Sequence, residues 1–390
     1  MTDLKEALNR VLDSAGLMPA ESVDLRKALN RILAEDIIAD INIPPFDKSA
    51  MDGYAIRKAD MDHDLEIIET VPAGKPPEKE IGPGQCAKIM TGAIVPQGAD
   101  MVVMKEDVED VKGETIRINR KSAKTNICLC GEDIAKGDKV LNRGTQILPA
   151  HIAMLASMGI TEPGVYALPR IALFATGSEL VEPGEKISPA KIRNSNSYQI
   201  LAQLERLGIT ADYLGILSDN EKELQKTIAE ATENYDVLIG TGGVSVGEYD
   251  LMPSILESVG YSLLIESLSI QPGKPLKFAV KSDKYCFALS GNPVSSYLQF
   301  ELLVVPFLQK LMGGSYATKG YPVEMLSDFK RKKAQRDLYI PVHVKQGKAE
   351  IVRYNGSAHI EAYTRANAVI RIEKNKFEIS KGEIADARSL

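Results

Sequence analysis

Glycine, hydroxyl and carboxylate residues gather directly after the apolar run 236–239. The segment 240–250 reads Gly-Thr-Gly-Gly-Val-Ser-Val-Gly-Glu-Tyr-Asp. Its closely spaced glycines let backbone N–H groups approach an anion, and the start of a following helix favours the same ligand. The segment matches neither the GxGxxG nor the Walker A pattern. It predicts either a phosphate-binding turn of another kind or an ordinary glycine-rich turn with Asp250 as a helix cap.

Two more carboxylates follow apolar runs. Glu179 stands in Thr-Gly-Ser-Glu after the run 171–175, and Asp219 follows the run 212–216. If these runs are parallel strands, their carboxyl ends meet at one edge, and Glu179, Asp219 and Asp250 surround one crevice. Oxygen ligands of this kind suit Mg²⁺ that also holds substrate phosphates. Taken singly, each carboxylate is equally explained as a cap or turn residue.

Two further segments offer hydroxyls and a cation. Ser-Gly-Asn-Pro at 290–293 begins a helix well, with Asn292 as cap, and an anion site at that helix end is the functional alternative. Gln-Pro-Gly-Lys-Pro at 271–275 sets Lys274 between prolines. This lysine is either a stiff, preorganised cation or a solvated residue of an ordinary turn.

The elements that must position these residues alternate between strand and helix. Strands are expected at 171–175, 212–216, 236–239 and 286–289, and helices at 196–207, 219–233, 250–259 and 293–311. This rhythm predicts an α/β multidomain protein containing a doubly wound, mostly parallel sheet. Ligands of such sheets bind outside the carboxyl ends of the strands, where the segments above lie.

The flanking regions have a different texture. Helices are expected over 4–12 and after Ser22, and short β-prone runs between Pro/Gly turns predict a small β domain inserted before a helix that resumes at Pro149. Alternating runs from Tyr321 predict a C-terminal β-barrel. We therefore expect four parts: a helical linker part (1–43 plus 144–168), the inserted β domain (44–143), the α/β domain (169–315) and the barrel (316–390).

Composition excludes several classes of protein. The 390 residues carry 47 Lys+Arg and 53 Asp+Glu, a net charge of −6, with no Trp and 6% aromatic residues. This balance disfavours a nucleic-acid binder that stacks bases or neutralises phosphates. No apolar run approaches the ~20 residues that span a bilayer. The four cysteines are scattered apart from Cys128-x-Cys130, which favours reduced thiols and a cytoplasmic location.

Taken together, the motifs resemble the molybdopterin molybdenumtransferase family, which is also the family of gephyrin's C-terminal enzymatic domain. The resemblance is carried in order along most of the chain by Pro-Pro-Phe-Asp-Lys-Ser-Ala-Met-Asp-Gly-Tyr-Ala (44–55), Met-Thr-Gly-Ala (90–93), Gly-Glu-Asp (131–133), Thr-Gly-Ser-Glu-Leu (176–180), the glycine-rich segment 240–250, Pro-Gly-Lys-Pro (272–275) and Ser-Gly-Asn-Pro (290–293).

The resemblance implies an enzyme that inserts molybdate into adenylylated molybdopterin, forming molybdenum cofactor and releasing AMP, with Mg²⁺. It also implies a homodimer whose active cleft lies between the α/β domain of one subunit and the β insertion of the other. The partners it suggests are molybdopterin adenylyltransferase and molybdoenzyme chaperones, with neither nucleic acid nor membrane.

Site residues follow from the same resemblance. The implied catalytic residues are Asp52, Asp133, Glu179, Asp250 and Lys274, and the implied metal ligands are Asp219 and Asp250. The implied substrate-binding residues are Thr176, Gly177, Ser178, Gly242, Gly243, Ser245, Pro275, Ser290, Gly291, Asn292, Arg336 and Ser357. Gln271 stands where the family often has Lys, which removes one cation from the site.

Three alternatives stay open: a molybdopterin adenylyltransferase, which shares a similar glycine-rich loop, a tungstate-using homologue, and a non-catalytic scaffold of the same fold. A scaffold could lose Asp250 or Lys274 without losing its task. The chain has both, which favours an enzyme.

Overall fold

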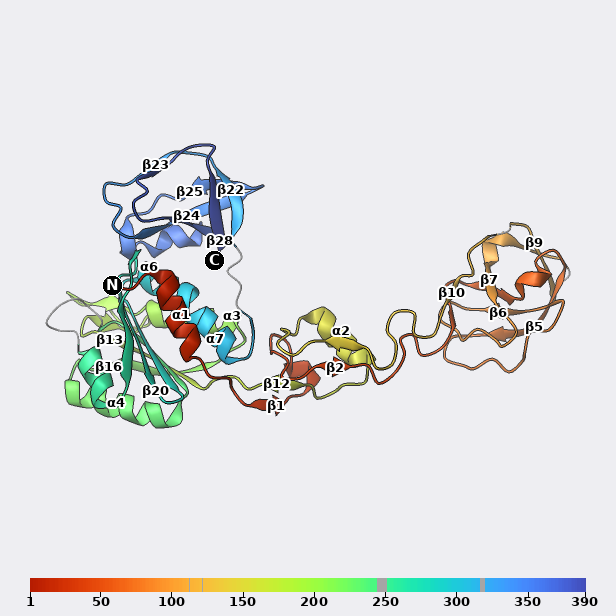
Figure 1. Cartoon of the computed structure of the whole chain (residues 1–390), viewed down its shortest axis with the longest axis horizontal. Helices are drawn as coiled ribbons and strands as arrows, with labels where there is room; N and C mark the ends of the chain where they lie inside the picture. The colour runs from red at the N-terminus through yellow and green to blue at the C-terminus, as the bar shows by residue number, and fades with distance from the viewer. Residues whose placement is uncertain (112, 121, 244–250, 316–319) are drawn as a thin grey trace. The chain divides into compact units, whose positions relative to one another are not determined.

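The computed structural model describes residues 1–111, 113–120, 122–243, 251–315 and 320–390 (Figure 1). The chain divides into two compact units. The first comprises Met1–Ala34, Gly144–Ala153 and Thr161–Leu390, and the second comprises Glu35–Arg143 and Met154–Ile160.

A six-stranded sheet forms the centre of the first unit. Its strands, in spatial order, are β16 (Ala211–Leu217), β13 (Ile171–Thr176), β17 (Val237–Thr241), β21 (Lys284–Leu289), β20 (Pro275–Lys281) and β18 (Ser262–Ser267). The first four are parallel, and β20 and β18 are antiparallel. The predicted mostly parallel sheet is therefore confirmed. Strand order reverses between β13 and β17, so the topological switch point lies at their carboxyl ends.

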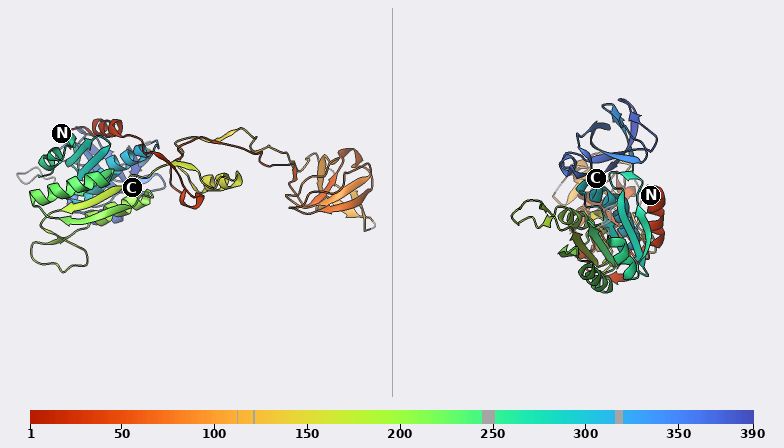
Figure 2. Two further views of the ribbon diagram at one scale, coloured as in Figure 1. Left: turned by 90° about the horizontal axis from the view of Figure 1, so that it is seen from below. Right: turned by 90° about the vertical axis from the view of Figure 1, so that its left-hand side faces the viewer.

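Helices cover both faces of this sheet (Figure 2). On one face lie α1 (Leu4–Ser14), α3 (Asn196–Arg206), α6 (Pro293–Gln299) and α7 (Val305–Leu311), and on the other α4 (Glu221–Asn234) and α5 (Met252–Ser258). Both faces of the sheet are apolar, because successive strand residues point to opposite faces. In β13, Leu173 packs into the first core, while Ala172 and Phe174 pack into the second. The sheet is thus doubly wound, and a π-helical turn, Phe300–Val304, joins α6 to α7.

The C-terminal strands close into a barrel, as predicted. They are, in order, β24 (Asp337–Lys345), β25 (Lys348–Ile351), β22 (Tyr321–Met325), β28 (Ile384–Ser389) and β26 (Ala368–Ile372), which pairs back with β24. The interior is aliphatic, with Ile340 and Ile370 fully buried. Strand β19 (Ile270–Gln271) adds to β24 in parallel, opposite Asp337. A short pair, β23 (Phe329–Lys330) and β27 (Glu378–Ile379), lies outside the barrel sheet.

The N-terminal region agrees only partly with expectation. Helix α1 is present, and α2 (Pro149–Ser157) begins where predicted. The helix expected after Ser22 is wrong: β1 (Ala20–Ser22) pairs with β12 (Gly164–Tyr166), and only a 3-10 turn, Leu25–Lys27, follows. Asn30 at φ 65° ends any helix there, and Leu29, on the predicted apolar stripe, is 48% exposed.

In the second unit, the regular structure of residues 35–143 is mainly β, as predicted for the insertion. Its sheet has the order β7 (Met101–Met104), β4 (Gly53–Ile56), β6 (Gln85–Ile89), β5 (Leu65–Val71), β9 (Thr115–Ile118) and β8 (Val108–Asp110). Two short pairs join β10 (Ile127–Cys128) to β3 (Lys48–Ser49) and β11 (Lys139–Leu141) to β2 (Ile37–Ile38).

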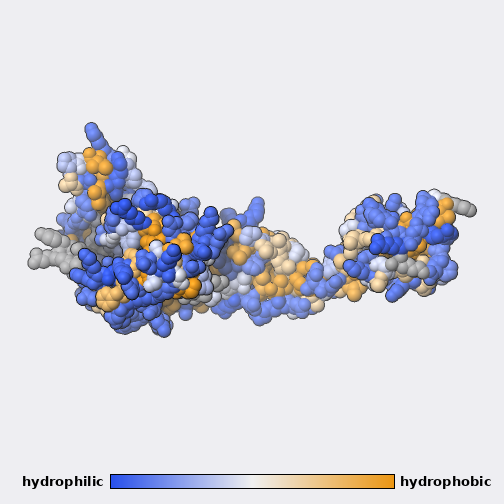
Figure 3. All heavy atoms as spheres, turned by 90° about the horizontal axis from the view of Figure 1, so that it is seen from above, coloured by the Kyte–Doolittle hydropathy of each residue, from blue (hydrophilic) through white to orange (hydrophobic). Residues whose placement is uncertain are grey.

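The surface is largely polar on the face that Figure 3 shows. In the described part of the chain, no helix is both long and apolar enough to cross a membrane. The four cysteines are free thiols, with Cys86 and Cys286 buried in the two units.

Candidate functional site

A cavity of about 260 Å³ opens at the switch point of the α/β sheet, and we call it the switch-point cavity. Its lining comes from the segment after β13, the short pair β14 (Leu180–Val181) and β15 (Ile192–Arg193), the start of α3, the ends of β17 and β21, and one barrel loop. The predicted residues that line it are Thr176, Glu179, Gly242, Gly291 and Asn292. Parallel strands therefore bring together residues that are far apart in the sequence.

Glycine is required where the turn after β17 passes Thr176. Gly242 has φ 89°, and a Cβ built on it would lie 2.2 Å from the Thr176 carbonyl oxygen. A Cβ on Gly243, at φ 65°, would lie 2.6 Å from the Thr176 hydroxyl oxygen. That hydroxyl is buried and has no hydrogen-bond partner among the described residues. The turn thus brings backbone close to a hydroxyl that is able to serve a ligand.

Sequence reasoning missed Asn196 and Thr241, which join two of these strand ends. The Asn196 amide donates to the Thr241 hydroxyl (3.0 Å) and to the Gly291 carbonyl (2.9 Å). Thr241 donates in turn to the Ser290 carbonyl (3.3 Å). Asn196 is 8% exposed, so its amide fixes the two turns relative to each other. The sequence does contain a signal for Asn196, because it is a polar residue that begins a helix directly after a strand-end loop.

The predicted carboxylates have different surroundings. Glu179 lines the switch-point cavity, and its carboxylate lies close against Gly177, where a Cβ would be 2.7 Å away. Asp219 accepts a hydrogen bond from the Ser178 N–H (2.7 Å). Asp250 and Ser245 lie outside the described residues. Among the residues that are described, no three His, Cys, Asp or Glu side chains gather as a metal site.

A second cavity of about 300 Å³, the lysine cavity, lies between the α/β sheet and the barrel. The predicted Lys274, Pro275, Arg336 and Ser357 all line it, although they come from three separate stretches of sequence. Asn292 lines this cavity as well as the switch-point cavity, so the two adjoin. The predicted Ser290 is 2% exposed and anchors the turn that reaches both.

The lysine cavity is electropositive. Lys274 is half-buried, and its ammonium has no hydrogen-bond or ion-pair partner in the part of the chain that is described. Arg336 donates one N–H to the Ile270 carbonyl (3.0 Å) and has further donors. Burial raises the pKa of Tyr354, which also lines the cavity, to about 12, so its phenol stays a neutral donor. No carboxylate stands among the described lining residues, so the cavity suits an oxyanion.

Arg331 holds the turn that carries Arg336. Its guanidinium donates to the carbonyls of Arg336 (2.7 Å), Lys376 (2.8 Å) and Glu373. The basic run 330–336 therefore does not behave as one solvated face. Lys332 and Lys333 are exposed, whereas Arg331 and Arg336 are partly buried and have defined contacts.

Asp52 and Asp133 both belong to the second unit. Asp52 accepts hydrogen bonds from the Thr91 N–H and hydroxyl, each at 2.8 Å, and lies 3.9 Å from the Lys105 ammonium. These contacts, the Thr91 bonds first, lower the pKa of Asp52, which is therefore ionised at neutral pH. Asp133 is exposed, and its N–H donates to the Ile43 carbonyl (3.0 Å). The catalytic roles of both stay predictions.

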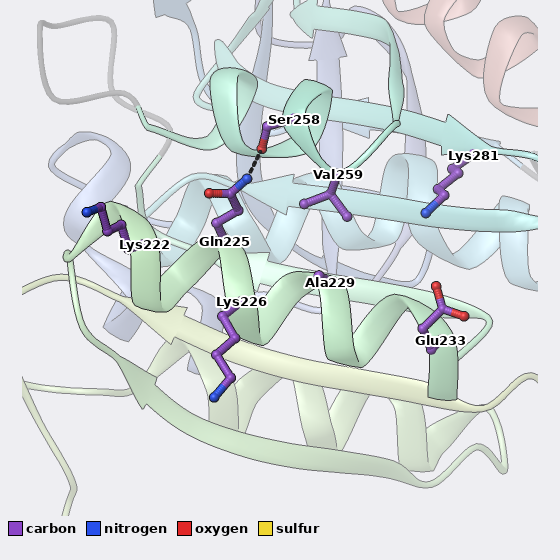
Figure 4. Close-up of a pocket in the computed structure, with 8 residues that line it drawn as sticks. All are labelled: Lys222, Gln225, Lys226, Ala229, Glu233, Ser258, Val259 and Lys281. Atoms are coloured by element: carbon purple, nitrogen blue, oxygen red, sulfur yellow. Dashed lines mark hydrogen bonds between the residues drawn. The ribbon is translucent and has the colours of Figure 1, made fainter.

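A third cavity, of about 380 Å³, lies between α4 and α5 (Figure 4). Lys222, Lys226 and Lys281 line this α4–α5 groove together with Glu233. None of the predicted site residues contributes to it. Lys222 and Lys226 are exposed, in contrast to the half-buried Lys274 of the lysine cavity.

The fold defines a multidomain α/β protein with two adjoining cavities, one of them at the switch point of a doubly wound sheet. Three family models match the chain: "MoeA N-terminal region (domain I and II)" over residues 2–159, "Probable molybdopterin binding domain" over 172–310, and "MoeA C-terminal region (domain IV)" over 322–390. The chain belongs to the molybdopterin molybdenumtransferase family, and the resemblance in the sequence is confirmed.

Relatives of known name agree along the whole length. The molybdopterin molybdenumtransferase of Haemophilus influenzae is 36% identical, with 98% of this chain and 97% of the relative covered. That of Staphylococcus epidermidis is 37% identical, with 98% and 94% covered. The crystal structure of the molybdopterin biosynthesis moeA protein from Pyrococcus horikoshii OT3 is 31% identical, with a TM-score of 0.86 and all of both chains covered. Family membership makes this chain an enzyme of the molybdotransferase class.

Proposed function

We propose that this enzyme inserts molybdate into adenylylated molybdopterin, with release of AMP and with Mg²⁺ as cofactor. The observation that carries the proposal is that two chemically different cavities share Asn292. The switch-point cavity offers hydroxyls, an amide and close backbone, which suit a phosphate-bearing pterin. The lysine cavity offers cations and hydroxyl donors, which suit the molybdate dianion.

In this proposal the residues of the chain position the two substrates and neutralise their negative charge. Thr176, Gly242 and Gly243 bind the pterin nucleotide, and Lys274 with Arg336 and Ser357 holds molybdate beside it. Lys274 stabilises negative charge as the anion enters, in a setting where fixed donors need no reorganisation. Holding both substrates in adjoining cavities lowers the entropy cost of their encounter.

Asp219 and Asp250 would hold the Mg²⁺. A carboxylate oxygen is the ligand that Mg²⁺ prefers, and the ion commonly binds through one or two carboxylates plus substrate phosphates. The donor set therefore fits the ion, although Asp250 lies outside the described residues. When bound, Mg²⁺ supplies Lewis-acid polarisation of phosphoryl oxygens. The Ser178 N–H keeps the Asp219 carboxylate oriented toward the segment after β13.

The deciding experiment is molybdate-dependent release of AMP from adenylylated molybdopterin, repeated with tungstate. Release that requires molybdate supports the proposal, and equal or better use of tungstate favours the tungstate-using alternative. In a second arm the protein receives molybdopterin and ATP without the adenylylated substrate. Transfer of AMP onto the pterin would identify an adenylyltransferase instead, and inactivity in both arms would favour a scaffold. Unchanged activity in Asp250→Asn would refute the metal assignment.

The proposal includes a cytoplasmic homodimer with a cleft shared between subunits, to which Asp52 and Asp133 of one chain contribute. Support comes from two exposed acidic residues in the second unit, of which Asp52 has a carboxylate oriented by Thr91. Mixing the Asp52→Ala and Lys274→Ala proteins tests it. If the cleft is shared, random reassortment restores activity to about a quarter of the wild-type level, because one cleft of each mixed dimer is intact. If each chain works alone, mixing restores nothing. The proposed partners are molybdopterin adenylyltransferase and molybdoenzyme chaperones. Their binding to the dimer is measured directly with the purified proteins.

A further inference from the structure

Gln299, the last residue of α6, is fully buried, and its primary amide binds the carbonyls of Gly273 and Pro275, which line the lysine cavity. We infer that Gln299 is a positioning residue that fixes Lys274 and the Ser290 turn relative to each other, an inference that rests on the function proposed above. Three hydrogen bonds carry it, and each one ends on backbone next to a predicted site residue.

Two of these bonds hold the backbone at Lys274. The Gln299 Nε2 group donates to the Gly273 carbonyl (2.9 Å) and to the Pro275 carbonyl (2.6 Å). These two carbonyls flank Lys274. The Lys274 carbonyl accepts from the Leu268 N–H (2.9 Å). The backbone on both sides of the lysine is thus fixed, and with it the point from which the ammonium reaches the cavity.

The third bond reaches the other wall. The Gln299 Oε1 atom accepts from the Ser290 N–H (2.9 Å). A flipped amide would face its oxygen toward two carbonyl oxygens and its NH₂ group toward an N–H, so only one orientation satisfies all three contacts. One side chain therefore joins the turn before β20 to the turn after β21.

This connection is needed because the sheet ends before it reaches these turns. The β20–β21 ladder runs from Lys281–Lys284 to its last pair, Lys277–Ala288. Among the described residues, no further pair of this ladder follows Lys277–Ala288, and the Gln299 amide bridges the two strands beyond it. The neighbours of Gln299, Leu298 and Phe300, are buried apolar residues, so an apolar side chain would serve packing alone. A buried amide whose hydrogen bonds are all formed also fixes the relative positions of the backbone groups that it binds.

Gln203 provides a matched control. It is 5% exposed on α3, and its Nε2 group donates to the Glu301 carboxylate (2.6 Å) and the Tyr297 carbonyl (3.4 Å). These bonds join helices and do not touch the turns of either cavity. Gln203→Met and Gln299→Met therefore each remove a buried amide with three hydrogen bonds, and only the Gln299 amide contacts the turns of the lysine cavity.

The test measures KM for molybdate and kcat by AMP release, and hydrogen–deuterium exchange of the segment 268–276. Gln299→Met should raise KM for molybdate about tenfold with kcat changed by less than about threefold, because a displaced Lys274 binds the anion less well. Exchange in 268–276 should increase. Gln203→Met should leave KM within about twofold and exchange in that segment unchanged.

Gln299→Glu is the second variant, in case the methionine protein does not fold. It keeps an acceptor for the Ser290 N–H but sets a carboxylate against the Gly273 and Pro275 carbonyls, so KM and exchange should rise at least as far. Equal effects of the Gln299 and Gln203 variants, or unchanged exchange in 268–276, would overturn the inference. If the wild-type protein released no AMP with molybdate, the proposed function would fail, while the exchange comparison would still decide the positioning role.

Discussion

The switch-point cavity and the lysine cavity are lined by different kinds of chemical group. The first is lined mainly by backbone, hydroxyls and amides at the ends of adjacent parallel strands, with Arg193 and Glu179 as its charged residues. The second sets Lys274 and Arg336 around a space that no described carboxylate lines. In the proposed function, this difference separates recognition of the extended pterin nucleotide by shape from neutralisation of the compact molybdate dianion by charge.

The largest expected effect comes from removing the lysine that defines the second cavity. Lys274→Ala should lower molybdate-dependent AMP release about 100-fold to 1000-fold, the range for loss of one preorganised group that stabilises negative charge. The control is Lys226→Ala in the α4–α5 groove, which should keep wild-type activity because this lysine is exposed and pairs only with Glu230 among the described residues (Figure 4). Near-normal activity of Lys274→Ala would remove the distinction between the two cavities.

A change in the switch-point cavity should affect the binding of adenylylated molybdopterin and not that of molybdate. The methyl group of Gly242→Ala would clash with the Thr176 carbonyl, 2.2 Å away, so the turn must move. KM for adenylylated molybdopterin should rise about tenfold, with KM for molybdate unchanged. Gly74→Ala has the same kind of backbone, φ 84°, with nothing within 4 Å of the added Cβ, and should leave both constants unchanged. An equal rise in both KM values would mean that the cavities act as one.

A smaller effect is expected one step behind the lysine cavity. Arg331→Lys cannot reach the three carbonyls that the guanidinium holds, so the turn carrying Arg336 should loosen. KM for molybdate should rise about threefold, which corresponds to loss of less than one net hydrogen bond. Lys333→Ala, on the exposed part of the same run, is the control. A change in KM for the pterin instead of molybdate would contradict this assignment.

The smallest effect on catalysis is expected at the opposite end of the same sheet. Asp236, just before β17, lies 3.0 Å from the Arg170 guanidinium and 3.1 Å from the Lys284 ammonium. Burial opposes ionisation, but bonds to Arg170 and Lys284 lower the pKa of Asp236 overall. Its stabilisation is therefore present above the unfolded carboxyl pKa of about 3.9 and is lost as pH falls through the folded value.

Asp236→Asn should therefore lower Tm by a few degrees at neutral pH, with the difference from wild type shrinking in acid. Thermal unfolding measured from neutral pH to about pH 2 tests the sign. Both KM values should stay unchanged at neutral pH. A change in either would show that stability alone affects the cavities, which would weaken every comparison made through KM.

The two cavities also differed in how far the sequence predicted them. The switch-point cavity follows from local signals, because apolar runs and the turn residues after them place Thr176 and Gly242 at one sheet edge. Gln299 and Arg331 could not be found in this way. Most of their partners are carbonyls distant in sequence, such as Gly273 for Gln299 and Lys376 for Arg331, and only packing brings those within reach. The helix expected after Ser22 failed for a related reason, since Asn30 and the β1–β12 pairing override the local apolar stripe.

The segment that carries Lys274 takes part in two sheets. Ile270 is in register with Asp337 of the barrel, and Pro275 is in register with Ser267 of the α/β sheet. The residues between these pairs must span a fixed distance, whatever their side chains are. An inserted or deleted residue in this connection would shift one of the two registers, whereas a substitution would leave both in place. The fold thus fixes the length of the segment that carries Lys274 and leaves its side chains as the variable part of the lysine cavity.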